Sequence, residues 1–116
     1  MGYRSEVVLA VSKEVLPQFL VTLAKSPETR AMCYQHADRR VDDYDGEGGV
    51  LFHWYGAKWY EGYEEVEAVQ DFMDWCDDED EDEGYRFIRL GEGLDDPADI
   101  RGRGFEALHV QRSVTY

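Results

Sequence analysis

The chain has 116 residues, with 26 Asp and Glu against 12 Lys and Arg, so its net charge is −14 at pH 7. Because 43% of the residues are hydrophobic and 14% aromatic, we expect one folded domain over residues 1–116 and not a disordered acidic tail. The sequence lacks the ~18 consecutive apolar residues of a membrane span, so we expect no membrane partner. It also lacks the basic excess of a nucleic-acid-binding protein, so we expect no direct contact with nucleic acid.

A strand and two helices are predicted in the first third of the chain. Residues 6–12 (EVVLAVS) form a β-branched apolar run that is typical of a central strand buried on both faces. Ser12 is the predicted N-cap of a first helix, whose apolar stripe comprises Val15, Leu16, Phe19, Leu20, Leu23 and Ala24. The sequence Ser-Pro-Glu at 26–28 repeats a helix start signal, which predicts a second, short helix to about His36.

A hairpin is predicted next. Residues 42–49 (DDYDGEGG) are rich in turn formers and precede a β-branched and aromatic run that favours a strand from Val50 to about Tyr55. Residues 39–44 are the expected partner strand. A calcium-binding interpretation of the turn fails, because Val41 and Phe52 occupy the first and last ligand positions of an EF-hand loop.

The remaining elements complete the predicted fold. A helix begins at Glu64, with a buried stripe of Val66, Val69, Phe72, Met73 and Cys76. Residues 85–90 and 105–114 are predicted strands, and residues 91–104 a loop. The order of elements indicates an α+β fold, with an antiparallel or mixed sheet of four to five strands and two main helices on one face.

The sequence contains no recognisable catalytic or metal-binding motif. Cys33 and Cys76 lack CxxC spacing, which favours reduced thiols in a cytoplasm over a disulfide scaffold. Cys33 and His36 are close in sequence, but a half-buried thiol and a surface imidazole explain them better than a zinc site does. Nucleotide-binding and nucleophile motifs are also missing. We therefore expect a protein that is not an enzyme and that uses no cofactor and no metal.

The excess negative charge is concentrated in one segment. Between Glu61 and Asp99 lie 17 of the 26 acids against two bases, Arg86 and Arg89, so this segment has a net charge of −15 and the rest +1. Its densest part is the acidic run of Asp77, Asp78, Glu79, Asp80, Glu81, Asp82 and Glu83. Such asymmetry produces a directional field, although an acidic run can also be only a solvated loop.

A second set of acids precedes the run on the same predicted helix. Glu64, Glu67, Asp71, Asp74 and Asp78 follow the spacing of one helical stripe. Consecutive members lie ~4.5 to 6 Å apart along the axis, on the order of the phosphate spacing in nucleic acids. The stripe therefore resembles a phosphate backbone and would attract a groove built to bind DNA.

An aromatic cluster lies directly before this helix and consists of Trp54, Tyr55, Trp59, Tyr60 and Tyr63. Core packing explains such a cluster, but Trp and Tyr are also enriched at binding hot spots. Core packing and partner binding can coexist if alternate side chains of the cluster lie on opposite faces of one strand. Tyr60 and Tyr63 are the members that we expect at a partner interface.

Three stretches carry a resemblance: MGYRSEV at 1–7, KWYEGYEEVEAVQDFMD at 58–74 and GYRFIRLGEG at 84–93. Together they resemble small acidic proteins of tailed bacteriophages and prophages, a group that includes anti-CRISPR and DNA-mimic inhibitors. The resemblance implies an anti-defence role in the host bacterial cytoplasm. The implied partner is a basic nucleic-acid-binding protein or ribonucleoprotein of the host.

Two functional hypotheses follow. In the first, the protein is a non-enzymatic phage inhibitor whose acidic surface occupies a nucleic-acid-binding site of a host complex. In the second, it is a phage or bacterial interaction or assembly module that binds through its aromatic surface, while the acids serve only solubility. The second hypothesis leaves a homodimer open.

Overall fold

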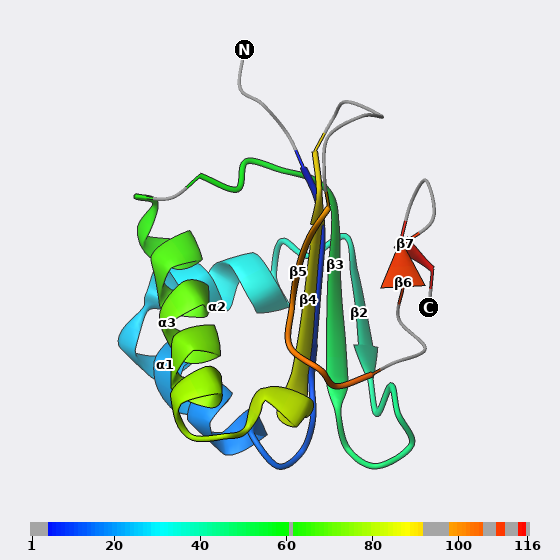
Figure 1. Ribbon diagram of the computed structural model, residues 1–116. Helices are drawn as coiled ribbons and strands as arrows, with labels where there is room; N and C mark the ends of the chain where they lie inside the picture. The colour runs from blue at the N-terminus through cyan, green and yellow to red at the C-terminus, as the bar shows by residue number, and fades with distance from the viewer. Residues whose placement is uncertain (1–4, 61, 92–97, 106–108, 111–113, 116) are drawn as a thin grey trace.

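The computed structural model describes residues 5–60, 62–91, 98–105, 109–110 and 114–115. Within these residues, three helices cover one face of a five-stranded sheet, and a two-stranded hairpin lies on the other side of the sheet (Figure 1). Every strand pair of the main sheet is antiparallel. The predicted α+β fold, with its helices on one face, is therefore confirmed.

The central strand of the sheet is the first in the chain. In spatial order the strands are β2 (Arg39–Asp42), β3 (Val50–Ala57), β1 (Ser5–Val11), β4 (Tyr85–Leu90) and β5 (Asp99–Arg101). Residues 7–11 of β1 are fully buried. β1 is thus covered on both faces, as its uninterrupted apolar run predicts.

The three helices are α1 (Leu16–Lys25), α2 (Pro27–Tyr34) and α3 (Glu64–Asp78). α1 begins later than predicted, because Val15 and not Ser12 precedes its first turn. This start places Pro17 in the first turn, where its missing N–H costs little. α2 begins as predicted, since the Ser26 hydroxyl accepts a hydrogen bond from the Thr29 backbone N–H at 3.4 Å. No helix of the described residues is long and apolar enough to cross a membrane.

The main core lies between the helices and the sheet. The Phe19 ring lies 5.7 Å from that of Phe52 on β3 and 5.0 Å from that of Phe72 on α3. All five apolar residues predicted to be buried on α3 are buried. On α1, however, Leu20 is 46% exposed and Ala24 is exposed, because the helix contacts the core through a narrower arc than its apolar stripe covers.

A second, smaller core lies on the opposite face of the sheet. Its fully buried members are Val8, Ala10, Leu51 and Ile88. The hairpin of β6 (His109–Val110) and β7 (Val114–Thr115) lies on this side of the sheet (Figure 1). The single strand predicted for residues 105–114 is therefore wrong, since two short strands in this region pair with each other.

The loop predicted for residues 91–104 also needs correction. It contains the edge strand β5, which pairs with β4 from Phe87 to Arg89. β5 has only three residues and is largely exposed, so it shows no hydrophobic alternation that a sequence pattern could reveal. Residues 92–97 of the predicted loop lie outside the described residues.

Candidate acidic interaction surface

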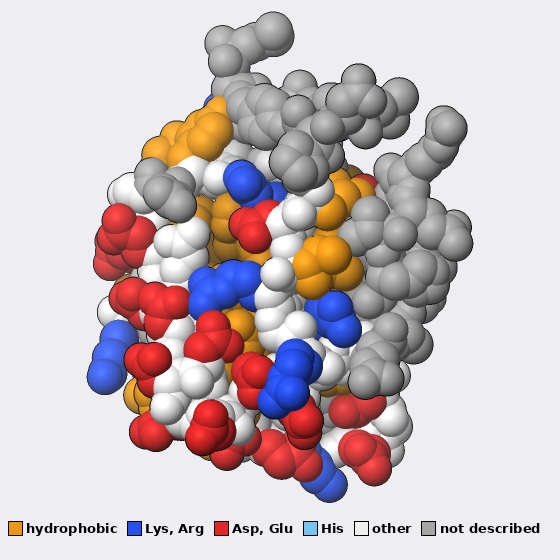
Figure 2. Space-filling model, in the orientation of Figure 1, with side chains coloured by type: hydrophobic (Ala, Val, Ile, Leu, Met, Phe, Trp, Pro, Cys, Tyr) orange, Lys and Arg blue, Asp and Glu red, His pale blue; other side chains and the backbone are white. Residues whose placement is uncertain are grey.

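The acidic stripe predicted from the sequence lies on the solvent side of α3. Its five members are exposed: Glu64, Glu67, Asp71, Asp74 and Asp78. The apolar face of the same helix packs on the sheet and turns these carboxylates outward. Figure 2 shows acidic side chains gathered over α3 and over the turn that follows it.

The acidic run forms a compact turn at the end of this helix. Asp77 and Asp78 belong to α3, and the 3-10 helix η1 (Asp82–Gly84) leads into β4. Between them Asp80 adopts a left-handed conformation with φ of 57°, and the Glu81 N–H donates to the Cys76 carbonyl at 2.7 Å. Six of the seven acids, all except Asp82, are exposed.

Arg101 of β5 reaches back to the last turns of α3. Its Nη2 donates to Asp74 Oδ1 at 2.9 Å and to Asp77 Oδ2 at 2.8 Å. Burial opposes the charge of this guanidinium, but the hydrogen bonds to the two carboxylates raise its pKa. Because α3 has no basic residue in its last turn, Arg101 supplies the cation that the negative end of the helix favours.

Arg103 makes a similar contact two residues further on. Its Nε and Nη2 donate to the two carboxylate oxygens of Asp82 at 2.7 and 3.1 Å, and Nη2 lies 3.8 Å from Glu83 Oε1. The hydrogen bonds from Arg103 lower the pKa of Asp82. The Arg103 side chain is 68% exposed, so this ion pair is screened by solvent and contributes little to stability.

These contacts divide the predicted acidic residues into two groups. Asp74, Asp77, Asp82 and Glu83 face an arginine of the same chain, and their charge is partly neutralised. The others are exposed and form no ion pair within the described residues. We call them the acidic ridge: Glu64, Glu67, Asp71, Asp78, Glu79, Asp80 and Glu81.

The contacts of Arg101 and Arg103 with the acids do not follow from the distribution of charge along the chain. Both arginines lie just beyond the acidic segment, which ends at Asp99. The available signal was the sequence RGRG at 101–104, two bases separated by glycines directly after the most acidic part of the chain.

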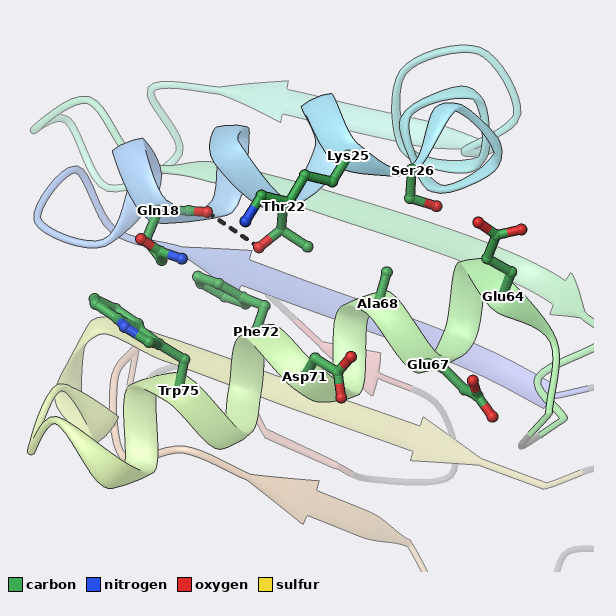
Figure 3. Close-up of a pocket in the computed structure, with 10 residues that line it drawn as sticks. All are labelled: Gln18, Thr22, Lys25, Ser26, Glu64, Glu67, Ala68, Asp71, Phe72 and Trp75. Carbon is green, nitrogen blue, oxygen red and sulfur yellow. Dashed lines mark hydrogen bonds between the residues drawn. The ribbon is translucent and has the colours of Figure 1, made fainter.

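A groove of about 430 Å³ separates α1 from α3 beside the ridge. Figure 3 shows Ser26 facing Glu64 at one end, and Gln18 facing Trp75 at the other. The α3 wall carries three carboxylates, whereas Lys25 is the one basic residue among those that line the groove. Three ridge residues therefore lie along one wall of the groove, and the lining residues of α1 add no acid to it.

The aromatic cluster is divided between core and surface, as the sequence interpretation allows. Trp54 and Trp59 are buried, with ring centroids 5.8 Å apart. Tyr55 and Tyr63 are exposed, and the half-buried Tyr60 packs edge-on against Tyr63 at 5.4 Å. The Tyr60–Tyr63 pair directly precedes Glu64 and so adjoins one end of the acidic ridge.

The two thiols lie inside the fold. Burial raises the pKa of Cys33 and of Cys76 to about 12, and nearby acids add to the effect at Cys76. Both therefore remain protonated at neutral pH. The described residues contain no group of three or more His, Cys, Asp or Glu side chains that could hold a metal ion.

The acids of the turn before β3 have a local structural role. Asp43 Oδ1 accepts a hydrogen bond from the Gly48 N–H at 2.6 Å, and Asp45 Oδ1 accepts from the N–H groups of Glu47 and Gly49. Partial burial opposes ionisation of Asp45, but these backbone hydrogen bonds hold its pKa below the usual value. The carboxylates of Asp43 and Asp45 thus stabilise the turn through hydrogen bonds to its own backbone.

No protein-family model, curated protein or solved structure matches this chain. The protein is therefore classified by its fold and its surface alone. The protein is a small α+β domain in which one helix and the turn after it present most of the described acids that form no ion pair.

Proposed function

We propose that the protein is a non-enzymatic, phage-encoded inhibitor of the anti-CRISPR or another anti-defence type. Its acidic ridge occupies a nucleic-acid-binding site of a host protein complex in the bacterial cytoplasm. The observation that supports this proposal is the ridge itself: seven exposed carboxylates on one helix and its following turn, in no ion pair within the described residues.

Part of the ridge is unfavourable for folding. Glu67 and Asp71 are like charges at i,i+4, which destabilise a helix by a few tenths of a kcal/mol. Asp78 and Glu79 lie at the end of α3, where the helix dipole favours cations. Glu64 and Glu67 lie in the first turn of α3, where the helix dipole favours acids. The fold gains nothing from the acids at the end of the helix, and binding to a basic partner offers a reason for them.

Three features suit this surface to binding. Long-range attraction between opposite charges accelerates encounter with a basic groove and weakens as salt screens it. Arg101 fixes the end of α3 against β5, so the backbone that carries the ridge needs little ordering when a partner binds. Tyr60 and Tyr63 supply an apolar contact that salt does not weaken.

The test is capture of host proteins on the immobilised full chain at low and high salt, followed by elution with duplex DNA. We expect a DNA- or RNA-binding complex to be retained at low salt and released by DNA. Retention of partners that neither salt nor DNA displaces would overturn the proposal.

A matched pair of variants separates the ridge from overall charge. The ridge variant combines Glu67→Gln, Asp71→Asn and Glu79→Gln. The control combines Glu14→Gln, Glu28→Gln and Glu47→Gln, which are exposed positions away from the ridge. Both variants lose three negative charges, but only the ridge variant is expected to lose the captured complex. Equal loss in both would show that net charge alone is responsible.

A second candidate function rests on the exposed apolar face of α1. Leu20 is 46% and Val21 45% exposed, and Pro17 and Ala24 are exposed beside them. An interaction or assembly module would bind a protein through such a face and use the acids only for solubility. Under this function, the double variant Leu20→Ser and Val21→Ser abolishes partner capture and the ridge variant does not.

A further inference from the structure

β2 is an edge strand with one side unpaired by any described strand. It pairs with β3 from Arg39 to Asp42, and it stands last in the order of the sheet. Alternate residues of an antiparallel edge strand direct their N–H and C=O groups outward, which makes the edge a template for another strand.

The sequence of β2 limits how the strand can pair with its own copy. Residues directly opposite each other in an antiparallel pair lie on the same face of the sheet. When two copies of one strand pair about a two-fold axis, the axis must therefore pass between one residue and the same residue of the second copy. Centred on Arg40, the pairing sets two arginines against each other. Centred on Val41, it sets Arg40 against Asp42 of the second copy on both sides of the axis. Charge complementarity therefore selects the register about Val41.

The two charged side chains are positioned for such a contact. Arg40 lies opposite Phe52, and Asp42 opposite Val50, so both face the helix side of the sheet. The Arg40 side chain is 40% exposed and that of Asp42 70%. They already contact each other within the strand, with Arg40 Nε 3.2 Å from Asp42 Oδ1. The Tyr34 ring, 5.0 Å from the guanidinium carbon, supports Arg40 at this edge.

We propose that β2 binds β2 of a second copy of this chain in antiparallel pairing about a two-fold axis at Val41. The two five-stranded sheets then form one continuous sheet, and the Arg40 and Asp42 side chains of both copies form a cluster of alternating charge. The proposal does not depend on the proposed function. Arg101 ties the last turns of α3 to β5 at the other edge of the sheet, so dimerisation leaves both ridges accessible.

The experiment measures the monomer–dimer equilibrium of the full chain by analytical ultracentrifugation. We expect the wild type to dimerise. Arg40→Asp opposes two acids across the axis, and Asp42→Arg opposes two bases. Each variant alone is expected to dimerise about tenfold more weakly, because two attractive cross-strand pairs become repulsive.

Mixing the two variants gives the decisive result. In a heterodimer, the acid introduced at position 40 faces the base introduced at position 42, and Asp42 of one chain faces Arg40 of the other. We therefore expect the mixture to recover wild-type affinity. A role of Arg40 and Asp42 within one strand cannot produce this rescue between chains.

Controls keep the result interpretable. Lys58→Asp and Glu67→Arg make the same charge changes at exposed positions away from β2 and are expected to leave the equilibrium unchanged. Circular dichroism checks that all variants are folded. A monomeric wild type, dimers unaffected by the β2 variants, or a mixture without rescue would each overturn the proposal.

Discussion

The Tyr85 hydroxyl donates a hydrogen bond to Asp77 Oδ1 at 2.8 Å, and this contact joins the first residue of β4 to the last turn of α3. The other oxygen of Asp77 accepts from Arg101. One carboxylate of the predicted acidic surface thus links a helix to two strands. Asp77 has a structural role that the acids of the ridge do not share.

Tyr85→Phe is expected to change how stability depends on alkaline pH. Burial raises the pKa of Tyr85 above its ordinary 10.0, and the hydrogen bond to Asp77 adds to the effect. The unfolded chain therefore ionises first, and the contribution of Tyr85 is complete below pH 10 and lost as the pH rises further. Urea denaturation should show a loss of about 1 kcal/mol at neutral pH and a shallower decline above pH 10. An unchanged alkaline decline would contradict this assignment.

Arg101→Leu is expected to lower the free energy of unfolding by about 1 to 3 kcal/mol. It leaves Asp74 and Asp77 unpaired at the negative end of α3. Arg103→Leu is the matched control, since the Arg103 side chain is 68% exposed against 28% for Arg101 and its ion pair should matter little. Denaturant midpoints compare the two variants. Equal effects would show that Arg101 is no more than another surface cation.

Gly102→Ala is expected to destabilise the fold strongly, by about 3 kcal/mol. Gly102 has φ of 85°, and an added Cβ would collide with the Tyr85 carbonyl oxygen. Gly46→Ala is the control, because Gly46 has φ of 73° but open space around it, so it should cost only about 1 kcal/mol. Thermal unfolding of both variants separates the two effects: a larger loss of stability for Gly102→Ala measures the collision with the Tyr85 carbonyl oxygen, because the positive φ is common to both positions.

Ser12→Ala and Ser26→Ala are expected to have different effects, although the sequence suggests the same capping role for both. Ser12 Oγ is buried without a hydrogen-bond partner among the described residues, so its removal should be neutral or stabilising. Ser26 Oγ accepts from the Thr29 N–H and lies 2.7 Å from Thr29 Oγ1. Its loss should cost about 1 kcal/mol, measured by urea denaturation. Equal losses would mean that Ser12 makes a contact in solution.

The features that could be predicted from the sequence are those set by neighbours along the chain. The 3.6-residue period placed Val66 and Cys76 in the core, and the apolar run identified β1 as the central strand. Ser26 was recognised as a cap because its partner, Thr29, is three residues away.

The features that could not be predicted depend on contacts between distant segments. Arg101 meets Asp77 across 24 positions and Asp74 across 27, and no local pattern indicates which acid it neutralises. Leu20 is exposed because α1 has too few neighbours to cover its whole apolar stripe, which the helical period alone does not reveal. Which acids remain unneutralised follows only from the folded arrangement.

The two faces of α3 make different demands on the sequence. The five buried residues hold the helix on the sheet, whereas the ridge residues touch nothing that the core needs. Substitutions of the ridge residues, unlike those of Asp74 and Asp77, can therefore accumulate with little effect on folding. A lineage under pressure from a changing partner, or a designer with a combinatorial library, could vary Glu67, Asp71 and Asp78 freely while the scaffold stays the same.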